Sequence, residues 1–216
     1  MQTEFIYRLA TKEDSQAILE FLREHFYPDE PLTHCVEPKE QDVHDENFIM
    51  DNVAAPDSIS LLALKENQIV GIVIAAKKTP DEVEKLVEEA AQLPGTKWAK
   101  LVLFLAKLEK ESNVYRKYNV NKVMHGHLIA VHRDYRRSDI AYNLYNKTME
   151  IAKLLEYAVC TSDCTSTHSA RLSERLGMKC IYTCNMEEYR VPGSDKQVFF
   201  PEKGQTLAKT YAKSML

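Results

Sequence analysis

A short charged turn joins two stretches of different pattern in the segment VHRDYRRSDIAYNLYNKTMEIA, residues 131–152. The chain before the turn is apolar and β-branched, and apolar residues after it recur at helical spacing. The first N–H groups of a helix lack intrahelical partners and carry the positive end of the helix dipole, so such a turn can bind phosphate groups through its backbone. The arginines add charge for phosphate contact, and Ala141 allows the helix a close approach. The candidate phosphate-binding residues are Arg136, Arg137, Ser138, Asp139, Ile140 and Ala141.

Asp139 is the unusual member of this turn, because a carboxylate near a pyrophosphate repels it. The repulsion at about 4 Å is roughly 1 kcal/mol per charge pair in water and about 4 kcal/mol at an effective dielectric of 20. Aspartate also tolerates the left-handed backbone and caps helices with its side chain, so an ordinary helix start is an alternative interpretation. We predict a working phosphate turn in which the Asp139 carboxylate points to solvent or toward Arg136 or Arg137.

Two histidines stand two residues apart in the apolar run KVMHGHLIAV. On a strand, this spacing places the side chains of His125 and His127 on one side of the sheet, where they can share a water molecule. Because histidine changes protonation near neutral pH, the pair is a candidate for general acid–base work. The alternative is that both rings point to solvent or form hydrogen bonds within the core.

The elements that must position these residues alternate between strands and helices. Apolar alternation and β-branched runs predict strands over 5–9, 58–65, 69–76, 122–131, 157–163 and 178–190. Helical spacing predicts helices over 42–52, 80–93, 96–118, 139–157 and 168–176, in addition to a first helix that starts at a capping box of Thr11 and Asp14. Residues 205–216 fit either a strand or a helical tail. The pattern indicates an α/β protein with one domain over residues 1–216.

Composition limits the classes of partner and the compartment. The chain has 216 residues, 44% of them apolar, and it contains neither a proline- and glycine-rich linker nor an apolar run long enough for a signal peptide or a membrane span. Its net charge of −4 comes from interspersed acidic and basic residues. We therefore expect a soluble cytoplasmic protein, monomeric or a weak dimer, that binds neither nucleic acid nor membranes.

The five cysteines are an odd number in a chain without an export signal, which favours reduced thiols. Cys160 with Cys164 and Cys180 with Cys184 form two CxxxC pairs, but structural zinc sites more often use CxxC turns. We expect buried free cysteines and no metal.

The order of elements, the arginine-rich turn and the ERLGM stretch resemble the GNAT superfamily of acetyl-CoA-dependent N-acyltransferases. Its turn reads Gln/Arg-x-x-Gly-x-Gly/Ala; Arg136 and Ala141 match, whereas Asp139 replaces the first glycine. The resemblance implies a mixed central sheet of about seven strands flanked by helices, with central parallel strands that splay apart. The pantetheine arm of acetyl-CoA would then pair with the backbone of the central strand, in the manner of an added strand. The implied backbone partners are Leu128, Ile129, Ala130 and Val131.

A narrower resemblance rests on YPDEPLTHC from Tyr27, on the long helical insert, and on CTSTHSARLSERLGM from Cys164. These stretches look like the insect arylalkylamine N-acetyltransferase family, and the likeness covers nearly the whole chain. It implies that Glu30 takes the proton of the amine and that Thr165 and Ser169 match two serines proposed to assist. A solvated loop carboxylate and ordinary helix caps are the alternatives. The HLIAVHR stretch resembles vertebrate serotonin N-acetyltransferases, in which a matching histidine pair relays the proton.

One departure concerns the acid that protonates the leaving thiolate. Many GNAT enzymes place a tyrosine four residues before a Gly-aromatic pair, and here Ser173 precedes Gly177 and Met178. A thiolate whose pKa is about 8.5 can take its proton from water. The expected function is acetylation of a small primary amine in a ternary complex, with an arylalkylamine such as dopamine, tyramine or serotonin as acceptor. Alternatives are a polyamine or agmatine acceptor, a CoA-binding pseudo-enzyme, or a protein N-acetyltransferase.

Overall fold

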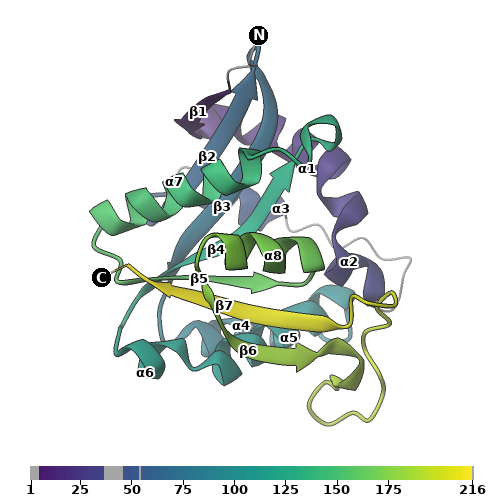
Figure 1. Cartoon of the computed structure of the whole chain (residues 1–216). Helices are drawn as coiled ribbons and strands as arrows, with labels where there is room; N and C mark the ends of the chain where they lie inside the picture. Colours follow the sequence, from purple (N-terminus) through teal and green to yellow (C-terminus); the bar gives the residue numbers. More distant parts are fainter. Residues whose placement is uncertain (1–4, 37–45, 54, 216) are drawn as a thin grey trace.

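The computed structural model describes residues 5–36, 46–53 and 55–215 and contains a seven-stranded mixed sheet with helices on both faces (Figure 1). The strand order is β1-β2-β3-β4-β5-β7-β6, in which β4 and β5 are parallel and the other neighbours are antiparallel. The strands are β1 Ile6–Leu9, β2 Ser58–Lys65, β3 Gln68–Lys78, β4 Val123–Val131, β5 Val159–Cys164, β6 Lys179–Asn185 and β7 Leu207–Ser214. The predicted mixed sheet of about seven strands is confirmed.

Eight α-helices and four short 3-10 helices complete the part of the chain that the structure describes. The α-helices are α1 Ser15–His25, α2 Pro31–Cys35, α3 Glu46–Asn52, α4 Glu82–Gln92, α5 Lys97–Ser112, α6 Val114–Tyr118, α7 Ile140–Leu154 and α8 Thr167–Arg175. The 3-10 helices are η1 Lys12–Asp14, η2 Tyr27–Asp29, η3 Arg133–Tyr135 and η4 Met186–Glu188. Over the described ranges, none of the helices is long and apolar enough to cross a membrane.

Several boundaries differ from the sequence prediction; for example, the helix predicted over 139–157 ends at Leu154, and the strand predicted over 157–163 begins at Val159. The single helix predicted over 96–118 is two helices, because Asn113 adopts a left-handed backbone with φ of 50° between α5 and α6. The strand predicted over 178–190 ends at Asn185, where η4 begins, and the ambiguous C-terminal segment forms strand β7. The helix predicted over 42–52 begins at Glu46 in the described residues, and residues 42–45 lie outside them.

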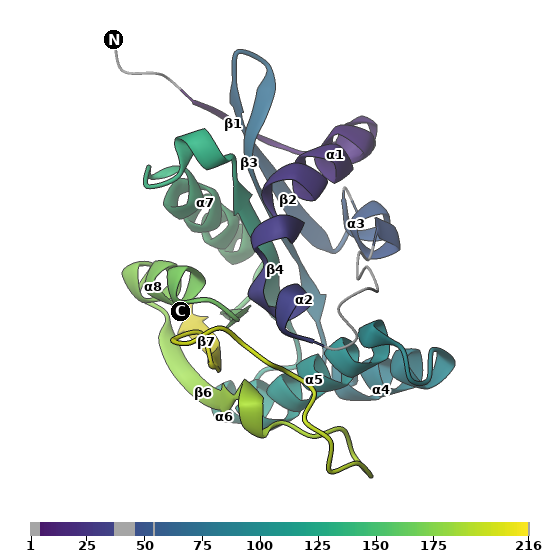
Figure 2. The same ribbon diagram turned by 90° about the vertical axis from the view of Figure 1, so that its right-hand side faces the viewer.

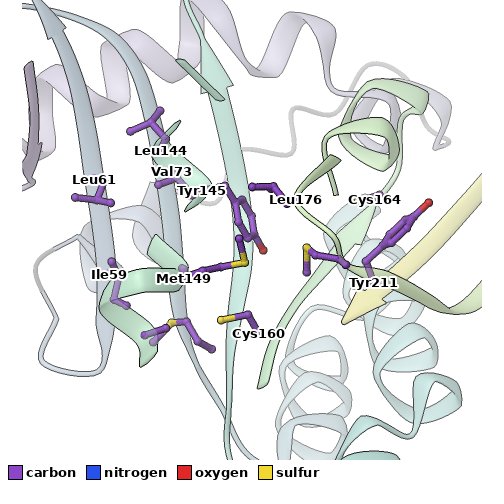
Figure 3. Close-up of a cluster of buried hydrophobic side chains, with 14 of the residues drawn as sticks. Ile59, Leu61, Val73, Leu144, Tyr145, Met149, Cys160, Cys164, Leu176 and Tyr211 are labelled. Carbon is purple, nitrogen blue, oxygen red and sulfur yellow. The ribbon is translucent and has the colours of Figure 1, made fainter. Parts of the chain in front are cut away.

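The two faces of the sheet are covered by different helices. Figure 2 shows α7 and α8 on one side and α1, α3, α4 and α5 on the other. The cluster beneath α7 and α8 is the largest apolar cluster of the core, and Figure 3 shows its side chains meeting between the sheet and the helices. Its labelled members are Ile59, Leu61, Val73, Leu144, Tyr145, Met149, Cys160, Cys164, Leu176 and Tyr211. Burial of this apolar surface from distant parts of the chain fixes α7 against the centre of the sheet.

The parallel strands β4 and β5 form a fork. Their pairing covers Met124 with Cys160, His125 with Thr161, and Gly126 with Ser162, and it extends no further along the described strands. Beyond that point β4 continues to Val131 while paired with β3 alone. The expected splay of the central parallel strands is present.

A β-bulge lies at the vertex of this fork. Ile74 pairs with Leu128 and Ala75 with Gly126, so His127 is an extra residue in β4. The bulge reverses which side chains of β4 face α7. Before the bulge an even-numbered residue, Met124, packs under α7, and after the bulge an odd-numbered residue, Ile129, packs there. The sequence pattern did not reveal the bulge, because both faces of β4 are apolar.

Gly126 is required at the vertex by the close approach of α7. A Cβ atom at this position would collide with the Tyr145 hydroxyl and lie 2.7 Å from two of its ring carbons. The Tyr145 side chain is buried, and its hydroxyl donates a 3.0 Å hydrogen bond to the Thr161 carbonyl oxygen on β5. The glycine therefore allows Tyr145 to connect α7 to β5, the second arm of the fork; β4 is the first arm.

We expect Gly126→Ala to lower the free energy of unfolding by about 1 to 3 kcal/mol, because an overpacked core must displace Tyr145. For a domain of this size the melting temperature would fall by roughly 2 to 4 °C per kcal/mol. Thermal unfolding of Gly126→Ala and of the double variant Gly126→Ala/Tyr145→Phe measures the effect. The double variant should be more stable than the alanine variant, since it removes the colliding hydroxyl; equal stability would contradict this account.

Candidate active site

The first arm of the fork carries the backbone that the sequence analysis assigned to the pantetheine arm. Leu128, Ile129 and Ala130 pair with Ile74, Val73 and Ile72 of β3. Within the described structure, β5 does not pair with these three residues of β4. The side of β4 that faces β5 therefore has backbone groups that can accept an added strand. Val131 ends the arm opposite Gly71.

Glu30 lies at the N-terminus of α2, where its carboxylate is held by donors from two segments. Oε1 accepts hydrogen bonds from Leu32 N at 3.1 Å and Thr165 Oγ1 at 3.0 Å. Oε2 accepts from the backbone nitrogen and the hydroxyl of Thr33, at 2.6 and 2.7 Å. Glu30 is therefore the N-cap of α2 rather than a solvated loop carboxylate.

Thr165 connects this carboxylate to the second arm of the fork, because it follows Cys164, the last residue of β5. Ser169 is engaged elsewhere. It forms a capping box with Ser166 at the start of α8, in which the Ser166 hydroxyl accepts from Ser169 N at 3.1 Å and the Ser169 hydroxyl accepts from Ser166 N at 3.4 Å. The structure thus brings Thr165 to Glu30, whereas Ser169 stabilises the helix.

His125 and His127 lie together at the vertex, with ring centroids 4.8 Å apart. His125 is buried, and its Nδ1 is 2.9 Å from Thr161 Oγ1. Burial lowers the pKa of His125 well below its usual range, and Lys78 and His127 lower it further. Burial, with the charge of Lys78, has the same effect on the pKa of His127. Both imidazoles are therefore neutral at neutral pH. The His132 ring instead contacts the His25 ring, with centroids 4.0 Å apart and the ring planes tilted by 46°.

The charged turn forms η3 and the residues up to the start of α7. Arg137 adopts the left-handed backbone with φ of 63°, whereas Asp139 has φ of −84°. The Asp139 carboxylate makes no hydrogen bond that caps the helix, so the capped-helix interpretation is wrong. Its side chain is 66% exposed and pairs with Arg175 of α8 at 2.7 Å, rather than with Arg136 or Arg137. The sequence missed this partner because Arg175 lies 36 residues further along the chain.

Arg136 has protein partners on three sides. It donates to the carbonyl oxygens of Val131 at 3.2 Å and His25 at 2.9 Å, and it forms an ion pair of 2.7 Å with Asp29. Arg133 lies 3.4 Å from the other oxygen of Asp29. These arginines hold the pKa of the Asp29 carboxyl below its usual value. The charged turn is therefore tied to the segment that carries Glu30, a connection that the sequence analysis did not predict.

We expect Asp139→Asn to tighten the binding of coenzyme A by up to about tenfold, because it removes one exposed negative charge from the turn. Asparagine keeps the shape of the side chain, and with φ of −84° the position does not need glycine. Titration calorimetry at low and high salt measures the effect, which should shrink as salt is added. Arg175→Gln serves as the control and should weaken binding, since it leaves Asp139 unpaired; tighter binding by the wild type than by Asp139→Asn would contradict the prediction.

Ser173, which stands where many relatives carry a tyrosine, is buried, and its hydroxyl lies 3.3 Å from Cys164 Sγ. It faces the core, so the structure gives it no role as the acid for the leaving thiolate. All five cysteines are free; Cys180 is exposed and the other four are buried. Burial raises the pKa of the Cys35 and Cys160 thiols to about 12, which makes them unreactive. Within the described ranges, no group of three or more metal-ligating side chains is present.

Solved structures of insect enzymes superpose on nearly the whole chain. A mosquito arylalkylamine N-acetyltransferase-like protein 5b matches with a TM-score of 0.91 and 28% identity over 98% of this chain and 100% of that one. A polyamine N-acetyltransferase of Drosophila melanogaster, which catalyses the formation of N-acetylagmatine, gives the same TM-score, identity and coverage. Arylalkylamine N-acetyltransferase 2 from Aedes aegypti matches with a TM-score of 0.87 and 20% identity over 99% of this chain and 100% of its own, which shows a common fold.

The family model of the acetyltransferase (GNAT) family matches residues 17–178, a range that includes Glu30, the fork and the charged turn. Enzymes of this family use acetyl-CoA as the acyl donor. The short pairing of β4 with β5 leaves backbone groups of β4 available for an added strand, and α7 begins at Ile140 shortly after β4 ends. This chain is an acyltransferase that belongs to the GNAT acetyltransferase family.

Proposed function

We propose that this enzyme transfers the acetyl group of acetyl-CoA to a small primary amine, with an arylalkylamine such as dopamine, tyramine or serotonin as the acceptor. The observation that carries the proposal is the fork itself. One arm has a strand edge open to the pantetheine arm, and the other leads through Thr165 to the carboxylate of Glu30. The thioester would lie between them, near the vertex at Gly126 and His127. The match to the mosquito arylalkylamine N-acetyltransferase-like protein supports the arylalkylamine class.

The proposed reaction is direct attack in a ternary complex. An ammonium acceptor with a pKa of about 10 has three N–H bonds and the amide product has one, so two protons leave the nitrogen. Glu30 takes the first proton and exposes the lone pair. The nitrogen then attacks the thioester carbonyl carbon, the second proton leaves the tetrahedral adduct, and the C–S bond breaks. The thiolate of coenzyme A takes one proton, and the other goes to solvent.

A second candidate acceptor is agmatine or another polyamine. The Drosophila enzyme that forms N-acetylagmatine is as similar to this chain as the mosquito protein is. The acidic residues expected to attract a second positive charge include Glu37, Glu40, Asp42 and Asp45, which lie outside the described residues.

One assay decides among the acceptors. Purified protein is incubated with acetyl-CoA and a panel of arylalkylamines, polyamines and short peptides, and thiol release is measured as kcat/KM. We expect the highest kcat/KM with an arylalkylamine. A higher value with agmatine or spermidine would select the second candidate, and activity restricted to peptides would indicate a protein N-acetyltransferase. Binding of coenzyme A without turnover of any acceptor would indicate a pseudo-enzyme.

A further inference from the structure

A buried charged cluster lies behind the vertex of the fork, on the face covered by α5. It consists of Lys78 on β3, Glu109 on α5, His125 on β4 and Asp163 on β5. The side chains of Lys78 and Glu109 are 5% and 6% exposed, and those of His125 and Asp163 are 5% and 7% exposed. Lys78 Nζ lies 3.2 Å from Glu109 Oε2, so these two charges compensate each other. Asp163 is left as a second buried carboxylate whose neighbour is a histidine.

The contacts of Asp163 single it out. Its Oδ1 accepts a 2.6 Å hydrogen bond from Thr210 Oγ1 of β7, which fixes the carboxylate. Its Oδ2 is buried, has no hydrogen-bond partner among the described residues, and lies 3.7 Å from Nε2 of His125. An unpaired buried carboxylate oxygen is costly unless it faces a group that can donate to it. The imidazole of His125 faces this oxygen at 3.7 Å, which is longer than a hydrogen bond, so the contact becomes an attraction of opposite charges when the ring is protonated.

The other side of His125 leads to the fork. Its Nδ1 lies 2.9 Å from Thr161 Oγ1, and its ring touches the ring of His127, the bulged residue at the vertex. The order from the fork inward is therefore His127, His125 and Asp163. A neutral histidine backed by a buried carboxylate is an arrangement that accepts a proton and stabilises the resulting imidazolium.

Other charged and titratable groups act on the same site. Lys78 lowers the pKa of His125 in addition to burial, whereas burial raises the pKa of Asp163 against the opposing effect of Lys78. Burial also raises the pKa of Glu82 on α4, and the pKa of Tyr115 on α6 is raised by burial and then by Glu109. Among these groups, Asp163 is the carboxylate whose oxygen lies beside the His125 ring.

We propose that Asp163 is a positioning residue for proton transfer: it holds the Nε2–H tautomer of His125 and stabilises its imidazolium after Nδ1 receives the second proton from the acceptor nitrogen. This inference rests on the proposed function. The N–H bond of the tetrahedral adduct breaks, its electron pair stays on nitrogen, and the proton is relayed to Nδ1 of His125 by the Thr161 hydroxyl, the group that Nδ1 contacts at 2.9 Å. The imidazolium then gives the proton to the coenzyme A thiolate or to solvent, which restores the neutral pair. Glu30 takes the first proton and releases it to solvent after the transfer, so the two acid–base sites act in sequence rather than as rivals.

The test is Asp163→Asn, which keeps the size of the side chain and removes its charge. We expect kcat to fall by about 10- to 100-fold, within the range that general acid–base groups supply, with little change in the Kd for coenzyme A. Loss of the carboxylate makes the imidazolium less favourable, so the pKa of His125 falls. The acidic limb of the kcat–pH profile should therefore move to lower pH by about one unit or more.

Ser162→Ala is the matched control for a structural effect. It removes a buried hydroxyl from the neighbouring position of β5, where Ser162 Oγ donates to the Gly126 carbonyl oxygen at 3.3 Å, and leaves every charge in place. Its acidic limb should coincide with that of the wild type. If the wild type acetylates an amine and Asp163→Asn has the same kcat and the same acidic limb of the kcat–pH profile, the inference about Asp163 is overturned while the proposed function stands. A wild type that acetylates no amine would overturn the proposed function as well.

A measurement on the wild type covers the case in which Asp163→Asn does not fold. The ¹⁵N chemical shifts of the His125 ring report which nitrogen carries the proton. We expect the proton on Nε2, facing Asp163, and an unprotonated Nδ1. The opposite tautomer, with the proton on Nδ1, would overturn the proposal without any variant.

Discussion

Glu30→Gln is expected to lower kcat for amine acetylation by about 10²- to 10⁴-fold at neutral pH, the range typical for loss of a general base. Glutamine preserves the volume but cannot take the proton of the ammonium group. The Kd for coenzyme A should stay nearly unchanged, because the donor is expected to bind the β4 edge and the turn before α7, and Glu30 lies at the start of α2. Steady-state kinetics with the preferred amine, together with calorimetry of coenzyme A, measures both quantities.

The control for Glu30 must separate catalysis from helix capping, because the same carboxylate caps α2. Glutamine leaves one oxygen to accept from the donors at Leu32 and Thr33, so a loss of about 1 kcal/mol in stability is expected as well. Thr33→Val removes the hydroxyl that donates to Oε2 and keeps both backbone donors and the carboxylate, and it should cost stability with a much smaller loss of kcat. Wild-type turnover and an unchanged pH profile in Glu30→Gln would assign the first proton to the histidine pair instead.

Lys78→Met is expected to destabilise the fold by about 3 to 5 kcal/mol, because it leaves Glu109 buried without its counter-charge. Burial alone would lower the pKa of Lys78, but attraction to Glu109, Asp163 and Glu82 raises it. Lys78 is therefore charged in the folded protein. At roughly 2 to 4 °C per kcal/mol, the melting temperature should fall by about 10 °C. Thermal or urea unfolding measures the change.

The double variant Lys78→Met/Glu109→Leu tests the reason for that loss. Replacing both members of a buried ion pair by apolar side chains is often neutral, since the desolvation of two charges is removed together with their attraction. The double variant should therefore recover most of the stability lost in Lys78→Met. If the double variant is less stable than Lys78→Met, this explanation is wrong, because removing the unpaired charge of Glu109 would not have restored stability.

The amino-acid sequence alone determined the local structure and the family. Apolar, β-branched runs placed β2 and β3 with a short turn over residues 66–68, and Glu66 and Asn67 adopt the positive φ that such a turn needs. Helical spacing placed α4, α5 and α7, and the capping box of Thr11 with Asp14 formed as predicted. The motifs around Glu30 and the charged turn indicated a GNAT acetyltransferase, which the family model confirms. These features depend on neighbours within a few residues, so their pattern is readable along the chain.

The geometry of the candidate site was decided by the tertiary structure. The bulge that puts His127 at the vertex, the bond from Thr165 to Glu30, and the pairing of Asp139 with Arg175 all join segments that are distant in sequence. The sequence did not indicate a role for Asp163 for the same reason. Its partners lie on β4 and β7, and within β5 it is one of several polar residues. Burial converts such residues into coupled groups, because charges interact strongly only when the fold removes the water between them.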